Sequence, residues 1–245
     1  MPRYFIELAY KGANYSGFQI QQNANSIQAE LTKALNIIFK AAFELTGSSR
    51  TDTGVHALQN FFHFDSDVLP EEKVLTERVY NLNAILPNDI VVKKIYEVAP
   101  DANCRFDAKS REYQYYIYQH KDPFLEDRAF YYPYTLDIDK LNAAAAAILN
   151  YTDFTSFAKK NSQVKTFDCT IVKSEWRIEN ELIIYNVQGN RFLRGMVRGL
   201  VGTMLRAGSN KISMNDFIAI IENKDAMQAD FSVPPQGLFL CSVNY

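Results

Sequence analysis

Arg50 and Asp52 lie two residues apart in the stretch 47–57, GSSRTDTGVHA, where an arginine and a carboxylate could act together in chemistry. A helical pattern precedes this stretch and an apolar strand pattern follows it, which indicates a loop between packed elements. Loops on a rigid scaffold carry many catalytic groups, and Gly47 and Gly54 permit the positive φ that a tight path needs. An ordinary turn has the same composition, so composition alone leaves both interpretations open.

A second candidate is the tract 182–215, which contains no carboxylate and five basic residues: Arg191, Arg194, Arg198, Arg206 and Lys211. We expect a helix over 192–207, on which the four arginines share one face and apolar residues the other, at about 100° per residue. A charged face is usually only solvated surface. Here it is all arginine, and three glycines would allow close approach, which favours binding phosphate or orienting a buried carboxylate.

The composition is that of a globular protein, with 47% hydrophobic and 22% charged residues among 245. No apolar run approaches the roughly 18 residues that span a bilayer, and the start, MPRYFIELAY, lacks the features of a signal peptide. We therefore expect a cytoplasmic protein without a membrane partner. The net charge of -2 and the isoelectric point near 6.0 are not those of a strongly basic nucleic-acid binder, so only a local tract could serve that purpose.

The cysteines Cys104, Cys169 and Cys241 are isolated and show no CxxC spacing. This pattern predicts neither a zinc site nor a disulfide framework. We expect all three to be buried as small apolar residues.

In the first half of the chain, strands and helices alternate. Asn25 and Gln28 resemble a capping box at the start of an amphipathic helix. The expected elements are a strand at 4–10, a loop at 11–21, a helix at 26–43, a strand near 61–65, a helix opened by Pro70, Glu71 and Glu72 that ends near Asn83, and a strand after a turn at 87–89.

The second half follows a linker at 100–110 that shows no periodicity. Strand 111–119 places Tyr113, Tyr115 and Ile117 on one face, a stripe that suits either sheet packing or base stacking. The other expected elements are strands at 169–178, 182–188 and 238–243, and helices at 138–149, capped by Asp137, at 192–207 and at 214–222. Two α+β domains joined near 100–110 are the economical architecture.

The chain resembles the tRNA pseudouridine synthase A family along essentially its whole length. The family's central signature is G-R-T-D-x-G-V-H, and residues 49–57 read SRTDTGVHA. Further motifs follow in the family's order: Y-x-G-x-x-Y-x-G-F-Q-x-Q at 10–21, S-I-Q at 26–28, L-P-N-D-I at 86–90, R-F at 105–106, R-x-Y-x-Y at 111–115, D-F-x-x-F at 153–157, F-L-x-x-M-V-R at 192–198 and G-L-F-L at 237–240.

The resemblance implies that the protein is an isomerase that converts uridine to pseudouridine in the anticodon stem-loop of tRNA, at positions 38 to 40, with no cofactor and no catalytic metal. Asp52 matches the catalytic aspartate. A carboxylate can attack the base or the sugar, stabilise a cationic sugar or relay a proton, and the sequence leaves these routes open.

The resemblance also gives roles to residues around Asp52. Arg198 matches an arginine that pairs with the aspartate, and Arg50 one that helps to extrude the target nucleotide. Tyr113 matches a tyrosine that packs on the flipped uracil, and Leu238 would add an apolar wall.

Three further residues belong to the expected substrate site. His56 follows Asp52 by four positions and has a structural or RNA-backbone role rather than a metal-binding one. Arg191 and Arg194 would bind the substrate from the arginine face.

For the fold, the family implies two α/β domains, which we assign to 1–103 and 104–245, with mainly antiparallel sheets that meet in a central cleft. It also implies a homodimer that binds tRNA. The chain departs from the family's usual residues at Lys11, Phe18, Ser49 and Thr170, none of which is an expected catalytic group.

Two other functions compete with this one. A non-catalytic RNA-binding protein could use the same aromatic strands and arginines, although it would have no use for a lone carboxylate in a cationic site. A metal-dependent hydrolase could use Asp52 and His56, but two ligands without a further carboxylate cluster are weak support.

Overall fold

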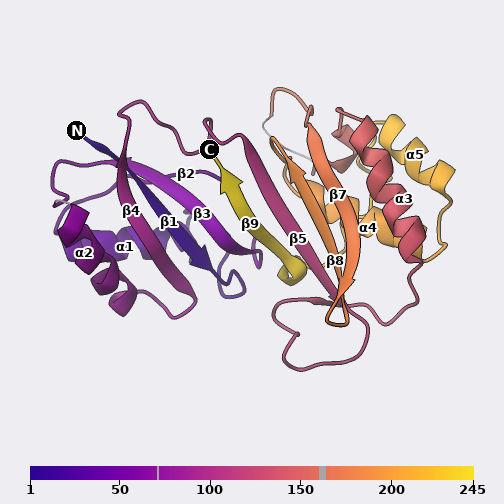
Figure 1. The fold of residues 1–245 in the computed structure, drawn as a ribbon, viewed down its shortest axis with the longest axis horizontal. Helices are drawn as coiled ribbons and strands as arrows, with labels where there is room; N and C mark the ends of the chain where they lie inside the picture. The colour runs from indigo at the N-terminus through magenta and orange to yellow at the C-terminus, as the bar shows by residue number, and fades with distance from the viewer. Residues whose placement is uncertain (71, 160–163) are drawn as a thin grey trace. The chain divides into compact units, whose positions relative to one another are not determined.

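The computed structural model describes residues 1–70, 72–159 and 164–245. Within these residues the fold has nine strands and five α-helices, with three short 3₁₀ helices. Contacts between Cα atoms divide the chain into two compact units, one of residues 1–109 with 240–245 and one of residues 110–239. Each unit combines helices with a mainly antiparallel sheet (Figure 1), so the predicted α+β class is confirmed.

In the first unit, β1 (Arg3–Tyr10) pairs antiparallel with β3 (His56–Asp65) on one side and with β4 (Ile90–Val98) on the other. The short β2 (Thr46–Gly47) and the end of β9 (Leu238–Asn244) both lie next to β3. Strand alternation buries Tyr4, Ile6 and Leu8 of β1 on one face. The pattern at 4–10 thus predicts its strand correctly.

Two helices accompany this sheet. Helix α1 (Ile27–Phe39) contacts α2 (Glu72–Ile85), and α2 packs against β4. Helix α1 ends four residues before the predicted Phe43 because Lys40 adopts a left-handed φ of 52°. For α2, the predicted opening includes Glu71, which lies outside the described residues, and the helix continues two residues past Asn83.

The predicted capping box at the start of α1 is wrong. The N-cap is Ser26, whose hydroxyl accepts a hydrogen bond from Ala29 N at 3.2 Å. Asn25 lies one residue too early. The side chain of Gln28 instead donates to Leu45 O at 2.8 Å, across to the segment that follows the helix.

The elements of the second unit are β5 (Ser110–Tyr118), β6 (Phe130–Tyr131), α3 (Ile138–Ala147), β7 (Ile171–Glu179), β8 (Leu182–Gly189), α4 (Met196–Gly208) and α5 (Met214–Glu222). The central strand is β8, which pairs antiparallel with β5 and with β7. The helices α3, α4 and α5 contact one another, and α3 also packs against β7.

The tyrosine stripe of β5 is part of the core. Tyr115 is fully buried, and its hydroxyl donates to Pro234 O at 2.7 Å. Ile117 is buried beside it, and Tyr113 nearly so. This placement favours the sheet-packing interpretation for Tyr115 and Ile117. The Asp137 cap of α3 is also confirmed, because its carboxylate accepts from Lys140 N at 3.1 Å.

Helix α4 begins at Met196, four residues after the predicted start at Phe192. Gly195 caps it with a φ of 73°, a left-handed conformation that interrupts any helix that might start earlier. Arg191 and Arg194 therefore precede the helix, and the prediction that they extend its arginine face is wrong.

The cysteines differ in burial. Cys104 and Cys169 are buried as expected, but Cys241 is only half-buried, so that part of the prediction is wrong. Cys104 Sγ lies 3.1 Å from His63 Nδ1, and burial lowers the pKa of that imidazole. Burial also raises the pKa of Cys169 to about 11.

We predict that one thiol reacts well before the other two when the native protein meets a disulfide reagent at pH 8. Cys241 is the accessible one, whereas a pKa of about 11 leaves Cys169 almost entirely protonated at that pH. Mass spectrometry of quenched samples identifies the site. Equal labelling rates at Cys241 and Cys169 in folded protein would contradict this packing.

Candidate active site

The stretch 48–52 is an irregular segment that bends at Ser48 and Ser49. Ser48, Ser49 and Thr51 are buried, whereas Arg50 is exposed and Asp52 half-buried. The arginine and the carboxylate that the sequence singled out are thus the two residues of this stretch that solvent reaches.

Backbone hydrogen bonds hold this segment along its length. Ser48 N donates to Phe61 O at 2.8 Å, and Phe18 N donates to Thr51 O at 3.1 Å. Directly afterwards the chain turns, with Val55 N donating to Asp52 O at 3.2 Å. Gly54, at a φ of 78°, supplies the left-handed residue of that turn. The Asp52 backbone is therefore fixed on both sides.

The glycine-rich stretch at 11–18 packs against this loop. A Cβ added to Gly12 would lie 2.0 Å from Val55 O, and Gly17, at a φ of 107°, would bring one to 3.2 Å from Thr51 O. No side chain fits at position 12. The family motif at 10–21 is thus the support on which the loop 47–57 rests.

His56 links the loop 47–57 to the stretch 11–18. It is the first residue of β3 and is buried, and its Nδ1 accepts a hydrogen bond from Gly12 N at 3.1 Å. An imidazole nitrogen that accepts from an amide carries no proton. Among residues 1–70, 72–159 and 164–245, no three His, Cys, Asp or Glu side chains are grouped as metal ligands.

The second unit carries the other expected residues. Tyr113 lies on β5, and its ring meets that of Phe192 edge-on at a centroid distance of 5.0 Å. Leu238 is the buried first residue of β9. Tyr113 and Phe192 together form an aromatic corner next to the tract that carries the arginines.

Arg198 lies in the first turn of α4 and is fixed by the chain that follows α5. Its Nε donates to Val233 O at 2.8 Å and an Nη to Phe231 O at 3.4 Å. These bonds hold the guanidinium plane in one orientation. A guanidinium has five N–H donors, so others remain that can bind another acceptor.

Arg191 and Arg194 lie in the irregular segment before α4. Arg194 is exposed, and its carbonyl accepts from Lys159 N at 2.9 Å. The glycines of α4 serve internal packing rather than an outside partner, since Gly199 faces the Phe231 ring and Gly202 faces Asp230 O. The close approach that the sequence suggested is thus made by the protein's own chain.

The structure therefore groups the predicted residues in two sets. Arg50, Asp52 and His56 belong to one loop and its exit into β3 in the first unit. The second unit holds the other set, Tyr113, Arg191, Arg194, Arg198 and Leu238. The pairing of Asp52 with Arg198 stays a prediction.

Relatives of known name cover the whole chain. The protein is 41% identical to tRNA pseudouridine synthase A of Parabacteroides distasonis over 100% of this chain and 96% of the relative. For the proteins of the same name from Bacteroides fragilis and Staphylococcus aureus, identity is 45% and 36%, with 99% and 97% of this chain covered and 96% and 89% of the relatives. A family model described as tRNA pseudouridine synthase also matches residues 144–245.

The chain belongs to the tRNA pseudouridine synthase A family. The resemblance found in its motifs is thereby confirmed, as is the prediction of an isomerase.

The described residues include no helix that is long and apolar enough to cross a membrane.

Sequence reasoning missed Tyr10 and Asn60 as supports of the loop. Asn60 sits at the start of the apolar run NFFHF of β3 and is fully buried there. An amide at a core position of a strand signals a specific hydrogen-bonded role, because a buried amide without partners is costly. That signal was present in the sequence.

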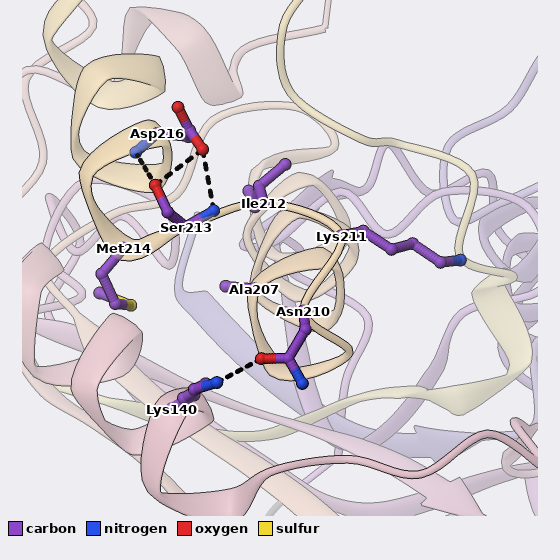
Figure 2. Close-up of a pocket in the computed structure, with 8 residues that line it drawn as sticks. All are labelled: Lys140, Ala207, Asn210, Lys211, Ile212, Ser213, Met214 and Asp216. Carbon is purple, nitrogen blue, oxygen red and sulfur yellow. Dashed lines mark hydrogen bonds between the residues drawn. The ribbon is translucent and has the colours of Figure 1, made fainter.

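One pocket of about 430 Å³ lies elsewhere in the second unit (Figure 2). Its polar groups bind one another: Lys140 Nζ to Asn210 Oδ1, and Ser213 to the Asp216 carboxylate in the capping box of α5. Of the candidate residues from the sequence, it contains only Lys211, the last basic residue of the tract 182–215. We interpret it as a junction between helix ends.

We predict that Gly12→Ala lowers the free energy of unfolding by about 1 to 3 kcal/mol, because the added methyl meets the backbone at Val55 and the two loops must separate. The exposed neighbour offers a matched control, since Ala13→Ser should change stability by less than about 0.5 kcal/mol. Urea unfolding of both variants measures the difference, and a Gly12→Ala protein as stable as wild type would refute the packing.

Proposed function

We propose that the protein isomerises uridine to pseudouridine in the anticodon stem-loop of tRNA, at positions 38 to 40, with Asp52 as the catalytic carboxylate. One observation carries the proposal: the loop buries Ser48, Ser49 and Thr51 and leaves Arg50 exposed and Asp52 half-buried. The relatives, at 36 to 45% identity, are named tRNA pseudouridine synthase A. A half-buried carboxylate on a hydrogen-bonded loop, two residues from an exposed arginine, suits such chemistry.

The reaction is a net rearrangement without redox change. The bond between uracil N1 and ribose C1′ breaks, the uracil turns in place, and C5 bonds to C1′. The hydrogen on C5 then leaves as a proton, and N1 gains a proton. The Asp52 carboxylate acts at this centre as a nucleophile or as a stabiliser of positive charge on the sugar, and a base must take the C5 proton.

Base flipping is part of the proposal, because the reacting bond is out of reach in a stacked RNA helix. Arg50 is exposed beside Asp52 and can take the place of the extruded nucleotide or hold its phosphate. Tyr113 packs on the flipped uracil from the corner that it forms with Phe192, and Leu238 adds an apolar wall.

The charged residues have separate roles in this proposal. Arg198, oriented by its bonds to Val233 O and Phe231 O, pairs with Asp52 and holds that carboxylate in one orientation. Arg191 and Arg194 bind phosphates of the RNA backbone. His56 supports the loop from behind through its bond with Gly12. The protein works in the cytoplasm as a homodimer on tRNA, with no cofactor.

The decisive prediction uses a tRNA transcript with tritium at uridine C5. Wild type releases tritium to water, because the C5–C1′ bond cannot form while C5 keeps that hydrogen. Asp52→Ala and Asp52→Asn should lower the rate by at least about a thousandfold, as expected when the central group of a catalytic unit is removed. Filter binding of the same tRNA should change little.

Three outcomes would count against the proposal. Release by Asp52→Ala at the wild-type rate would exclude the carboxylate role. Binding without any release by wild type would favour the non-catalytic RNA-binding alternative. Loss of release in chelator would revive the metal-dependent alternative. Mapping the product by reverse transcription after carbodiimide treatment tests which tRNA position is modified. Pseudouridine found only outside positions 38 to 40 would contradict the proposed position.

A further inference from the structure

Thr51, the residue between Arg50 and Asp52, is held by hydrogen bonds in the protein interior. Thr51 is 8% exposed, and its hydroxyl lies 2.7 Å from the hydroxyl of Tyr10, which is also buried. Tyr10 OH in turn accepts from Asn60 Nδ2 at 3.1 Å. Either hydroxyl can be the donor in the bond between Tyr10 and Thr51, and the three side chains form one chain of hydrogen bonds.

Asn60 uses its whole hydrogen-bonding capacity at this point. Besides Tyr10, its Nδ2 donates to Ser49 O at 2.8 Å, while its Oδ1 accepts from Ser49 N at 3.3 Å and from Phe61 N at 2.9 Å. A primary amide has two donors and accepts about two bonds, so all are in use. Because Asn60 is fully buried, shifting Ser49 would leave amide groups without partners or water.

These bonds fix the loop at the two positions that flank Arg50. Asn60 holds both backbone groups of Ser49, and Tyr10 holds the side chain of Thr51. Phe18 N adds a bond to Thr51 O. The peptide that leads directly into Asp52 thus has little freedom to move relative to β1 and β3.

We propose that Tyr10, Thr51 and Asn60 are positioning residues that set the place of the Asp52 carboxylate for catalysis. The inference rests on the proposed function of Asp52. All three side chains are buried and bonded to one another or to the loop, so they act through the loop. A displacement of about 1 Å can cost a hundredfold in rate, which gives the network a measurable effect on turnover.

A purely structural role would have a different signature. Loss of a buried hydrogen bond anywhere lowers stability, but it leaves turnover unchanged while the protein stays folded. A positioning role lowers kcat at temperatures well below unfolding and leaves KM for tRNA nearly constant, because Arg191 and Arg194, which bind the RNA backbone, are untouched.

The test compares two substitutions at one position. Thr51→Val keeps the size but removes the hydroxyl, and Thr51→Ser keeps the hydroxyl. We expect Thr51→Val and Tyr10→Phe to lower kcat for tritium release about 10- to 100-fold with KM within threefold, and Thr51→Ser to remain within threefold of wild type. The double variant Thr51→Val with Tyr10→Phe should lose no more kcat than the more impaired single variant, because both substitutions remove the same hydrogen bond.

The second unit offers a matched control. Tyr185 is a fully buried tyrosine whose hydroxyl lies 2.9 Å from Ser174 Oγ, so Tyr185→Phe removes an equivalent pair away from the loop. It should lose stability but keep kcat. Folded Thr51→Val and Tyr10→Phe with wild-type kcat, or an equal loss of kcat in Tyr185→Phe, would overturn the proposal.

A second readout separates this inference from the proposed function. If wild type releases no tritium, the function of Asp52 fails, and amide hydrogen exchange of residues 48–52 then decides the network. Exchange at least tenfold faster in Thr51→Val than in Thr51→Ser supports positioning, and equal exchange in the two variants refutes it.

Discussion

The antiparallel register of β1 and β3 is the constraint on which the candidate site depends. It pairs Leu8 with Asn60 and, after an irregularity, Tyr10 with Ala57. That register brings the Tyr10 hydroxyl to the Asn60 amide. The same amide holds the loop at 48–52 by a hydrogen bond to Ser49 O. A slip of one residue between the two strands would place the Tyr10 and Asn60 side chains on opposite faces of the sheet and release the loop.

The second unit uses a different device. Arg198 is oriented by carbonyls of the segment 231–233, and the ring of Phe231 occupies the groove that Gly199 leaves open in α4. In the first unit, distant parts of the chain therefore hold the backbone that carries Asp52, and in the second they hold the Arg198 side chain itself. Such fixing lowers the reorganisation that a reaction requires.

Local periodicity predicted most elements, among them β5 with its buried tyrosine face and α5 with its bounds. It failed where one residue overrides a pattern, as at Gly195, whose left-handed backbone delays α4 and takes Arg191 and Arg194 off the helix. The family motifs pointed to Arg50 and Asp52. They could not reveal the bond between Asn60 and Tyr10, because its partners are 50 residues apart and no local pattern records such a contact.

The central claim is that the Asp52 loop is ordered before RNA arrives. Amide hydrogen exchange of residues 47–57, in free protein and in protein saturated with tRNA, tests it most directly. The account predicts that the amides of Ser48, Ser49 and Val55, which are hydrogen-bonded in the free protein, exchange slowly in both states. Fast exchange in the free protein, with protection only after tRNA is added, would contradict it.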